Sequence, residues 1–92
     1  MKSRANKRFW EAFDKLPLNV HRRARRNYRI WRKNPYHPSL YFKAVVPEKS
    51  IYSVRISYSW RVLGIWEGDW MIWFWIGSHE DYNNLVSQLR RN

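Results

Sequence analysis

The chain contains no cysteine and only seven acidic residues among its 92. Without cysteine it can form neither a disulfide scaffold nor a thiolate zinc site. The seven carboxylates are scattered along the chain, so they supply no pair for glycosidase chemistry or two-metal catalysis. The longest apolar run, residues 70–77, is far too short to cross a bilayer, and residues 1–9 contain no apolar export segment. We therefore expect a soluble cytoplasmic protein with no membrane partner.

Positive charge and aromatic side chains are abundant instead. Lys and Arg number 18, which gives a formal net charge of +11, and aromatic residues make up 18% of the chain. A strongly basic protein that is rich in aromatic rings suits a polyanion whose bases can stack, most simply a nucleic acid. A chain of 92 residues is short enough to form one domain over residues 1–92.

Helical spacing of apolar residues predicts two antiparallel helices in the first third of the chain. The first covers residues 9–16 and ends at Pro17, and the second runs from about residue 17 to residue 33. Asn34-Pro35 ends the second helix, because the residue before a proline is pushed out of helical geometry. Residues 1–5 are either a frayed end or an edge strand.

Alternating and apolar runs predict strands at residues 40–46, 51–57, 60–66 and 70–76, the last of them at the centre of the sheet. We expect turns at residues 47–50 and 67–69, and we expect Gly77 to end the last strand. Ser78 is then a suitable N-cap for a short final helix. This order predicts an α+β domain with a three- to four-stranded antiparallel sheet.

The second predicted helix carries a run of seven basic residues and no acid: Arg22, Arg23, Arg25, Arg26, Arg29, Arg32 and Lys33. Like charges three and four residues apart destabilise a helix by roughly a few tenths of a kcal/mol per pair. A helix that tolerates several such pairs is expected to face anionic material, either phosphates or an acidic protein. The alternative is an ordinary solvated helix face.

Four further residues are candidates for chemistry. Arg55 and Arg61 lie on neighbouring predicted strands and would bind a phosphate together if their side chains converge, or they are ordinary surface arginines. His79 follows the last strand, with Tyr82 three residues further on, and histidine is the side chain that exchanges protons near neutral pH. A structural role is the alternative for this histidine. The three histidines have no metal-ligand spacing, so we predict neither a metal site nor a cofactor.

Several short motifs together resemble the RelE/ParE superfamily of bacterial type II toxins. They are Leu16-Pro17, Asn-Pro-Tyr-His-Pro-Ser-Leu at 34–40, Tyr-Ser-Val-Arg at 52–55, Trp-Arg-Val-Leu-Gly at 60–64, and Ile-Trp-Phe-Trp-Ile-Gly-Ser-His-Glu-Asp-Tyr at 72–82. The resemblance implies two helices packed on one side of an antiparallel sheet. It also implies a metal-free endoribonuclease that cuts mRNA in the ribosomal A site. Such a toxin is silenced by a cognate antitoxin in a hetero-oligomeric complex.

The resemblance also assigns roles to individual residues. Arg61 would stabilise the charge on the scissile phosphate, Arg55 matches a basic strand residue of the family, and His79 would be the general acid or base. Tyr82 would orient the substrate or stack on it. The RNA-binding residues expected with them are Lys43, Ser53, Arg22, Arg23, Arg26 and Arg29.

This sequence departs from the family at the residues that take up a proton. Ser53 and Arg55 stand where some RelE enzymes have lysines, and no carboxylate stands near Ser39, where other relatives place a glutamate base. His79 is then the residue best suited to proton transfer. Two other functions stay open, a ParE-like module that inhibits DNA gyrase and an inactive basic binding module of the same fold.

Overall fold

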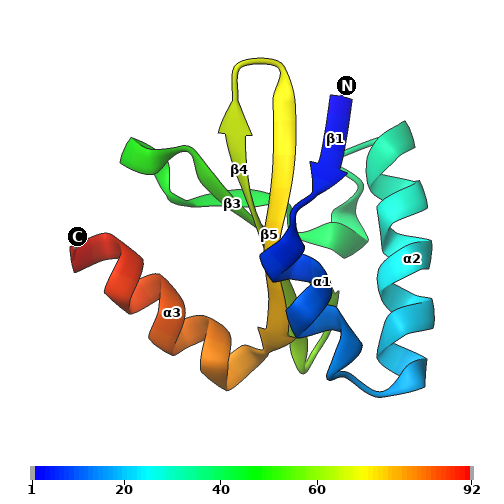
Figure 1. Ribbon diagram of the computed structural model, residues 1–92. Helices are drawn as coiled ribbons and strands as arrows, with labels where there is room; N and C mark the ends of the chain where they lie inside the picture. Colours follow the sequence, from blue (N-terminus) through cyan, green and yellow to red (C-terminus); the bar gives the residue numbers. More distant parts are fainter. Residues whose placement is uncertain (1, 92) are drawn as a thin grey trace.

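The computed structural model describes residues 2–91, which form a five-stranded sheet and three α-helices (Figure 1). The elements in chain order are β1 (Lys2–Ala5), α1 (Lys7–Asp14), α2 (Leu18–Lys33), β2 (Lys43–Val46), β3 (Ile51–Ser57), β4 (Trp60–Glu67), β5 (Trp70–Ser78) and α3 (His79–Arg91). Two short 3₁₀ turns, Pro38–Leu40 and Pro47–Lys49, flank β2. The α+β class predicted from the sequence is confirmed.

The sheet is mixed and has the strand order β1-β5-β4-β3-β2. Four of its strands are antiparallel, as predicted, but β1 runs parallel to β5, with Lys2 opposite Trp70 and Ala5 opposite Trp73. The prediction of a three- to four-stranded antiparallel sheet was therefore wrong in strand number and in this pairing. Of the two alternatives given for residues 1–5, the edge strand is confirmed for Lys2–Ala5. Its parallel pairing was missed because its partner β5 lies far away in the sequence. The prediction for residue 1 lies outside the described residues.

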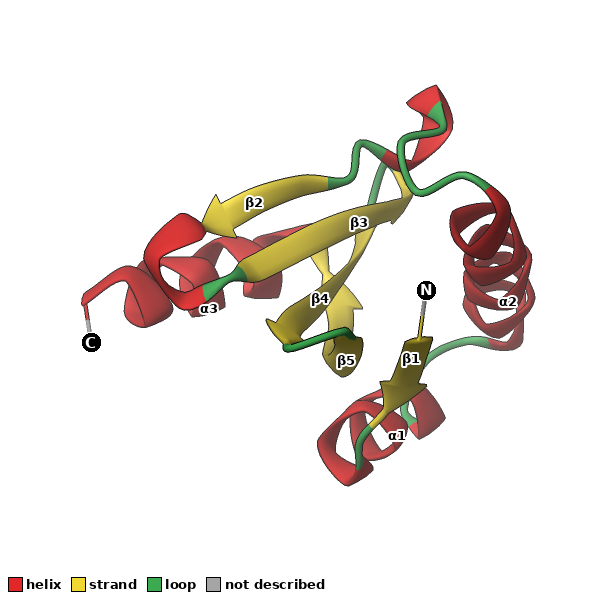
Figure 2. Cartoon of the chain, turned by 90° about the horizontal axis from the view of Figure 1, so that it is seen from above, coloured by secondary structure: helices red, strands yellow, loops and turns green. Residues whose placement is uncertain are grey.

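The two faces of the sheet are covered by different helices (Figure 2). Helices α1 and α2 pack on one face, around a core cluster that includes Phe13, Trp31 and Trp73. Helix α3 packs on the other face, where Tyr82 and Val86 meet Leu63 of β4. Three layers result, with the sheet in the middle. Among the described residues, no helix is both long enough and apolar enough to cross a membrane.

Irregular pairing in the sheet changes which residues face each layer. Leu63 lies opposite Trp75 and Gly64 opposite Trp73, so Phe74 is one extra residue in β5, a β-bulge. Because of this bulge, Trp73 belongs to the α1–α2 core while Trp75 packs with the α3 core. The middle strand is β4, and β5 lies between β4 and β1, which corrects the prediction that residues 70–76 are central.

Gly77 lies inside β5 and does not end it, contrary to the prediction from sequence. A Cβ atom at this position would overlap the Trp75 indole, which covers the glycine on the same side of the strand. The glycine is therefore required for packing, and the strand continues to Ser78. The Ser78 hydroxyl accepts a hydrogen bond from the Asp81 amide at 3.1 Å, which confirms Ser78 as the cap of α3.

Most other boundaries agree with the predicted ones to within two residues. Helix α1 begins two residues early because Asn6 caps it, its side-chain oxygen accepting from the Phe9 amide at 3.0 Å. The predicted strand at 40–46 begins only at Lys43, since Leu40 closes a 3₁₀ turn and Tyr41 has a left-handed backbone with φ 47°. Because of this turn, Tyr41 lies outside strand β2.

Candidate functional site

The strand register places Arg55 and Arg61 directly opposite each other on β3 and β4. Residues paired in this way on antiparallel strands share a face of the sheet, with Cβ atoms about 5 Å apart. The two side chains therefore converge, which the sequence had left open. Burial, and then the charge of Arg55, lower the pKa of the Arg61 guanidinium below its usual value, while Tyr82 and Tyr58 oppose the shift.

A pocket of about 260 Å³ opens at this pair, and we call it the basic pocket. Its lining residues are Tyr41, Lys43, Ser53, Arg55, Arg61, His79, Tyr82 and Asn83. The lining thus holds the four predicted catalytic residues together with Lys43 and Ser53 from the predicted RNA-binding set. These eight residues include three permanent cations and no carboxylate, so the pocket is suited to an anion.

The β3–β4 turn holds two of the pocket residues in place. Nη1 of Arg61 lies 2.6, 3.2 and 3.0 Å from the carbonyl oxygens of Ser57, Tyr58 and Trp60. This nitrogen has two hydrogens, so the remaining three N–H groups of the guanidinium, on Nη2 and Nε, are left for other acceptors. The backbone amide of His79 donates to the Ser59 carbonyl at 2.8 Å. One turn therefore positions both Arg61 and the first residue of α3.

Tyr82 forms the inner wall of the pocket. It is only 9% exposed, and its hydroxyl lies 3.5 Å from the buried Ser53 hydroxyl. Its ring centroid is 5.9 Å from that of His79 and 6.0 Å from Cζ of Arg61. Tyr82 therefore packs beneath the exposed His79 and beside Arg61.

Two exposed tyrosines flank Arg55, and the sequence analysis did not identify either of them. Cζ of Arg55 lies 4.9 Å from the Tyr41 ring centroid and 5.9 Å from the Tyr58 ring centroid, within range of cation–π attraction. Tyr41 is 59% exposed and Tyr58 is 81% exposed. For Tyr58, the available signal was a large aromatic residue between the strands predicted at 51–57 and 60–66. Tyr41 was missed because it fell within the strand predicted at 40–46.

The four predicted RNA-binding arginines of α2, Arg22, Arg23, Arg26 and Arg29, do not line the basic pocket. All four are exposed and lie on a helix of the opposite layer. Helix α2 is nevertheless tied to the strand that carries Arg55, because Asn27 Nδ2 donates to the Arg55 and Ile56 carbonyls at 3.0 and 3.1 Å. Nε of Arg23 also donates to the Ile56 carbonyl, at 3.1 Å. Within residues 2–91, no group of three or more His, Asp or Glu side chains comes close enough together to hold a metal ion.

Residues 18–84 match the sequence model of the ParE-like toxin domain. The chain belongs to the ParE-like toxin family. This match covers most of the chain and all the residues of the basic pocket, and it confirms the RelE/ParE resemblance inferred from the motifs. No protein of curated function matches the chain in sequence.

Two solved toxin structures share the fold. A copper-bound mutant toxin from Helicobacter pylori is 24% identical, with a TM-score of 0.65 over 88% of this chain and 97% of that chain. The RelB-RelE antitoxin-toxin complex from Methanococcus jannaschii gives 13% identity and a TM-score of 0.70 over 88% of this chain and 95% of that chain. At these identities the comparison establishes the fold and does not extend to the chemistry.

Proposed function

We propose that this toxin is a ribosome-dependent mRNA endoribonuclease and that the basic pocket holds the scissile phosphate. The observation that carries the proposal is the convergence of Arg55 and Arg61 across β3 and β4, next to His79. Two guanidinium groups can bind phosphate oxygens bidentately and stabilise the extra negative charge of the transition state. Lys43 adds a third positive charge to the same pocket.

The proposed reaction needs only the RNA, the protein and solvent water. The 2′-hydroxyl loses its proton and attacks the adjacent phosphorus, and the bond from phosphorus to the 5′-oxygen breaks. The 5′-oxygen takes up a proton, so the products are a 2′,3′-cyclic phosphate and a 5′-hydroxyl end. His79 exchanges one of these two protons, as general base or general acid, and solvent water exchanges the other, so that no proton is gained or lost overall.

His79 is favoured because the other pocket residues are poorly suited to proton transfer. Arg55 and Arg61 remain protonated and cannot act as bases. Ser53 is 2% exposed and lies against the Tyr82 hydroxyl. Holding the RNA in line and stabilising phosphate charge then supply much of the rate, as they do in other phosphoryl-transfer enzymes.

The exposed rings around Arg55 favour single-stranded RNA as the ligand. Tyr41 and Tyr58 have solvent-accessible faces beside the phosphate pocket, where unpaired bases can stack on them. Each stacked base contributes about 1–3 kcal/mol to binding in single-strand-binding proteins. We expect these two tyrosines to position the bases on either side of the cleaved bond. Tyr82 orients the substrate from beneath.

Two partners accompany this function. The exposed arginines of α2 would bind phosphates of ribosomal RNA or of the mRNA outside the pocket, which fits the acid-free helix and the net charge of +11. A cognate antitoxin would neutralise part of that charge, as expected for a family whose Methanococcus jannaschii relative was solved as an antitoxin–toxin complex.

Primer extension on a defined mRNA in a purified translation system tests the proposal. The wild type is run with and without ribosomes, beside His79→Ala and Arg61→Ala. We expect discrete stops that require ribosomes and that both substitutions abolish. Stops that both variants retain would refute the assignment of the pocket.

DNA gyrase inhibition is the second candidate, because the matching family is described as ParE-like. It predicts that supercoiling by purified gyrase falls in the presence of the toxin while the mRNA stays intact. A folded protein that produces no RNA stops and does not inhibit gyrase would favour an inactive binding module.

A further inference from the structure

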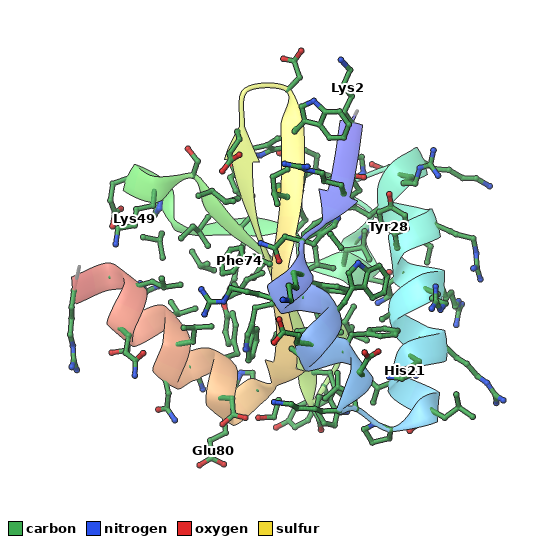
Figure 3. The ribbon with its side chains drawn as sticks, viewed as in Figure 1. Lys2, His21, Tyr28, Lys49, Phe74 and Glu80 are labelled. Carbon is green, nitrogen blue, oxygen red and sulfur yellow. The ribbon has the colours of Figure 1, made fainter. Side chains whose placement is uncertain are left out.

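Trp70 is an exposed tryptophan at the tip of the β4–β5 hairpin, and two cations of β1 lie beside its ring. It is the first residue of β5 and is 41% exposed. Nζ of Lys2 lies 5.8 Å and Cζ of Arg4 lies 6.0 Å from the ring centroid, within range of cation–π attraction. Figure 3 shows Lys2 next to this hairpin tip. We call these three residues the tryptophan site.

The parallel pairing of β1 with β5 brings the three side chains together. Lys2 lies opposite Trp70 in the register, and Arg4 follows two residues later on β1. Neighbouring residues of a strand point to opposite faces of the sheet. The Ser3 hydroxyl bonds the Tyr28 hydroxyl of α2 at 2.7 Å, so Ser3 points to the face that α1 and α2 cover. The side chains of the tryptophan site therefore leave the sheet on the other face, which also carries the basic pocket.

The tryptophan site is separate from the basic pocket. Strand β4 runs from the turn beside Arg61 to Glu67, which lies opposite Trp70. At the usual rise of a strand, Arg61 and Glu67 are about 20 Å apart. Lys2 and Arg4 also precede residues 18–84, the part of the chain that matches the toxin family. Any ligand held here is therefore bound by residues that the match does not include.

Charge is distributed unequally around the exposed ring. Glu67 lies opposite Trp70 on the β4 side, and Asp69 precedes it in the hairpin turn. Lys2 and Arg4 lie on the β1 side. An anionic group is therefore attracted to one side of the indole and repelled from the other. This arrangement suits a ligand that joins a flat ring to a phosphate. It does not suit an anionic membrane surface, which would meet both sides at once.

We propose that the tryptophan site binds one unpaired nucleotide of a single-stranded nucleic acid. The base stacks on the Trp70 indole, and Lys2 and Arg4 bind the phosphates next to it. Bases in a duplex are already stacked and paired, so a single strand is the ligand. Lysine on an edge strand commonly blocks pairing with another chain, but that role does not require an exposed tryptophan beside it. The proposal goes beyond RNA cleavage, because it holds whether or not the toxin cuts RNA.

Fluorescence anisotropy with a single-stranded RNA of about 12 nucleotides tests the stacking. The RNA is 2′-O-methylated, so it lacks the 2′-hydroxyl nucleophile and cannot be cleaved. Trp70→Leu should weaken binding about tenfold. Trp10→Leu removes a tryptophan of similar exposure, 43%, from α1, and as the matched control it should have little effect. An oligonucleotide that has phosphates and sugars but no bases should bind the wild type and Trp70→Leu equally.

The salt dependence of binding tests the phosphate contacts. For single strands, the logarithm of the affinity falls with the logarithm of the salt concentration, with a slope of about −0.7 per phosphate contact. Lys2→Gln should therefore make the slope shallower by about 0.7. Lys7→Gln removes the same charge from α1 and should leave the slope unchanged. Glu67→Gln with Asp69→Asn should strengthen binding about twofold, because it removes the repulsion on the β4 side.

Three outcomes would overturn the proposal. They are a Trp70→Leu variant that binds RNA as well as Trp10→Leu, a Lys2→Gln variant with the slope of Lys7→Gln, and full displacement of the RNA by an equal concentration of a glutamate-rich peptide. Thermal melts check that each variant is folded.

The same variants are measured again with Arg61→Ala, which alters the basic pocket. Losses caused by Trp70→Leu and Lys2→Gln should persist in this background. Losses that disappear there would belong to the basic pocket and would also overturn the proposal. A wild type that binds the uncleavable RNA through Trp70 but gives no stops in primer extension would refute the nuclease proposal alone.

Discussion

The two hollows on either side of the sheet differ in nearly every physical property. The basic pocket is lined by charged and hydrogen-bonding groups and is fastened by backbone contacts of the β3–β4 turn. The apolar cleft, a hollow of about 300 Å³ between α1 and α2, is lined mainly by core side chains such as Phe13, Trp31 and Trp73 and is charged only at its rim, by Arg4, Arg25 and Arg29. The difference shows that the sheet keeps its polar site, on the α3 face, apart from the opening into the main core.

The sharpest test of this separation is His79→Ala. We expect RNA cleavage to fall by about 10²-fold or more, the usual contribution of a general acid or base. The free energy of unfolding should change little, since the His79 side chain is exposed. Timed primer extension measures the first quantity and chemical denaturation the second. A large loss of stability would show that His79 also supports the fold.

Asn27 is the residue that links the two hollows. It lines the apolar cleft, and its amide donates to the carbonyls of Arg55 and Ile56. Asn27→Ala should cost about 1–3 kcal/mol of unfolding free energy, because buried carbonyls lose a donor. It should also weaken phosphate binding by loosening the strand that carries Arg55.

Chemical denaturation and phosphate titration measure these two effects of Asn27→Ala. Asn19→Ala, at an exposed position of the same helix, is the matched control. If Asn27→Ala has the same free energy of unfolding as this control, the Asn27 hydrogen bonds to the Arg55 and Ile56 carbonyls make no net contribution to stability.

The α3 cap offers a smaller effect confined to the basic pocket. Ser78→Ala removes the acceptor of the Asp81 amide and should cost about 1 kcal/mol of unfolding free energy. Cleavage should fall modestly, since the frayed helix start holds His79 less firmly. Ser78→Asp keeps the cap and should restore both stability and cleavage, as measured by thermal melts and primer extension. Failure of Ser78→Asp to rescue would point to another role for the serine.

The smallest expected effect is a change in stability. Arg55→Gln removes a positive charge directly opposite Arg61, which relieves repulsion, but it also removes the cation–π contacts with Tyr41 and Tyr58, so the two effects should nearly cancel, to within about 1 kcal/mol of unfolding free energy. It should also raise the pKa of Arg61 toward its usual value, because the charge of Arg55 contributes to lowering it. The same variant should lose stabilisation by added inorganic phosphate. Arg25→Gln, at the cleft rim, is the control. Calorimetric melts with and without phosphate compare the two variants, and an Arg55→Gln variant that phosphate stabilises as much as Arg25→Gln would contradict this account.

Local patterns predicted much of the fold. Alternation gave β3 its observed bounds, and the prolines together with the helical spacing of apolar residues placed α2 to within a residue. The pairing of β1 with β5 and the bulge at Phe74 were missed, because both depend on contacts between distant segments. Gly77 was misread because its neighbour in space is the Trp75 ring, which sequence spacing alone does not reveal.

The site could be predicted only in part, for the same reason. Residue type and strand position identified Arg55, Arg61, His79 and Tyr82, and the register then brought them into one pocket. Tyr41 and Tyr58 depend on turn geometry, which the sequence did not specify. The acid-free run of arginines in α2 predicted RNA-binding residues there. These arginines nevertheless lie outside the pocket, because α2 packs on the opposite face of the sheet.

The parallel pairing of β1 with β5 also has a consequence for the order in which the chain can fold. Lys2 pairs with Trp70, which follows α1, α2 and three other strands in the chain. Pairings of such long sequence separation form late, since the intervening chain must first be brought together. Until then the Arg4 side of the apolar cleft is missing. The strand β1 is therefore among the last parts of the sheet to be fixed in place.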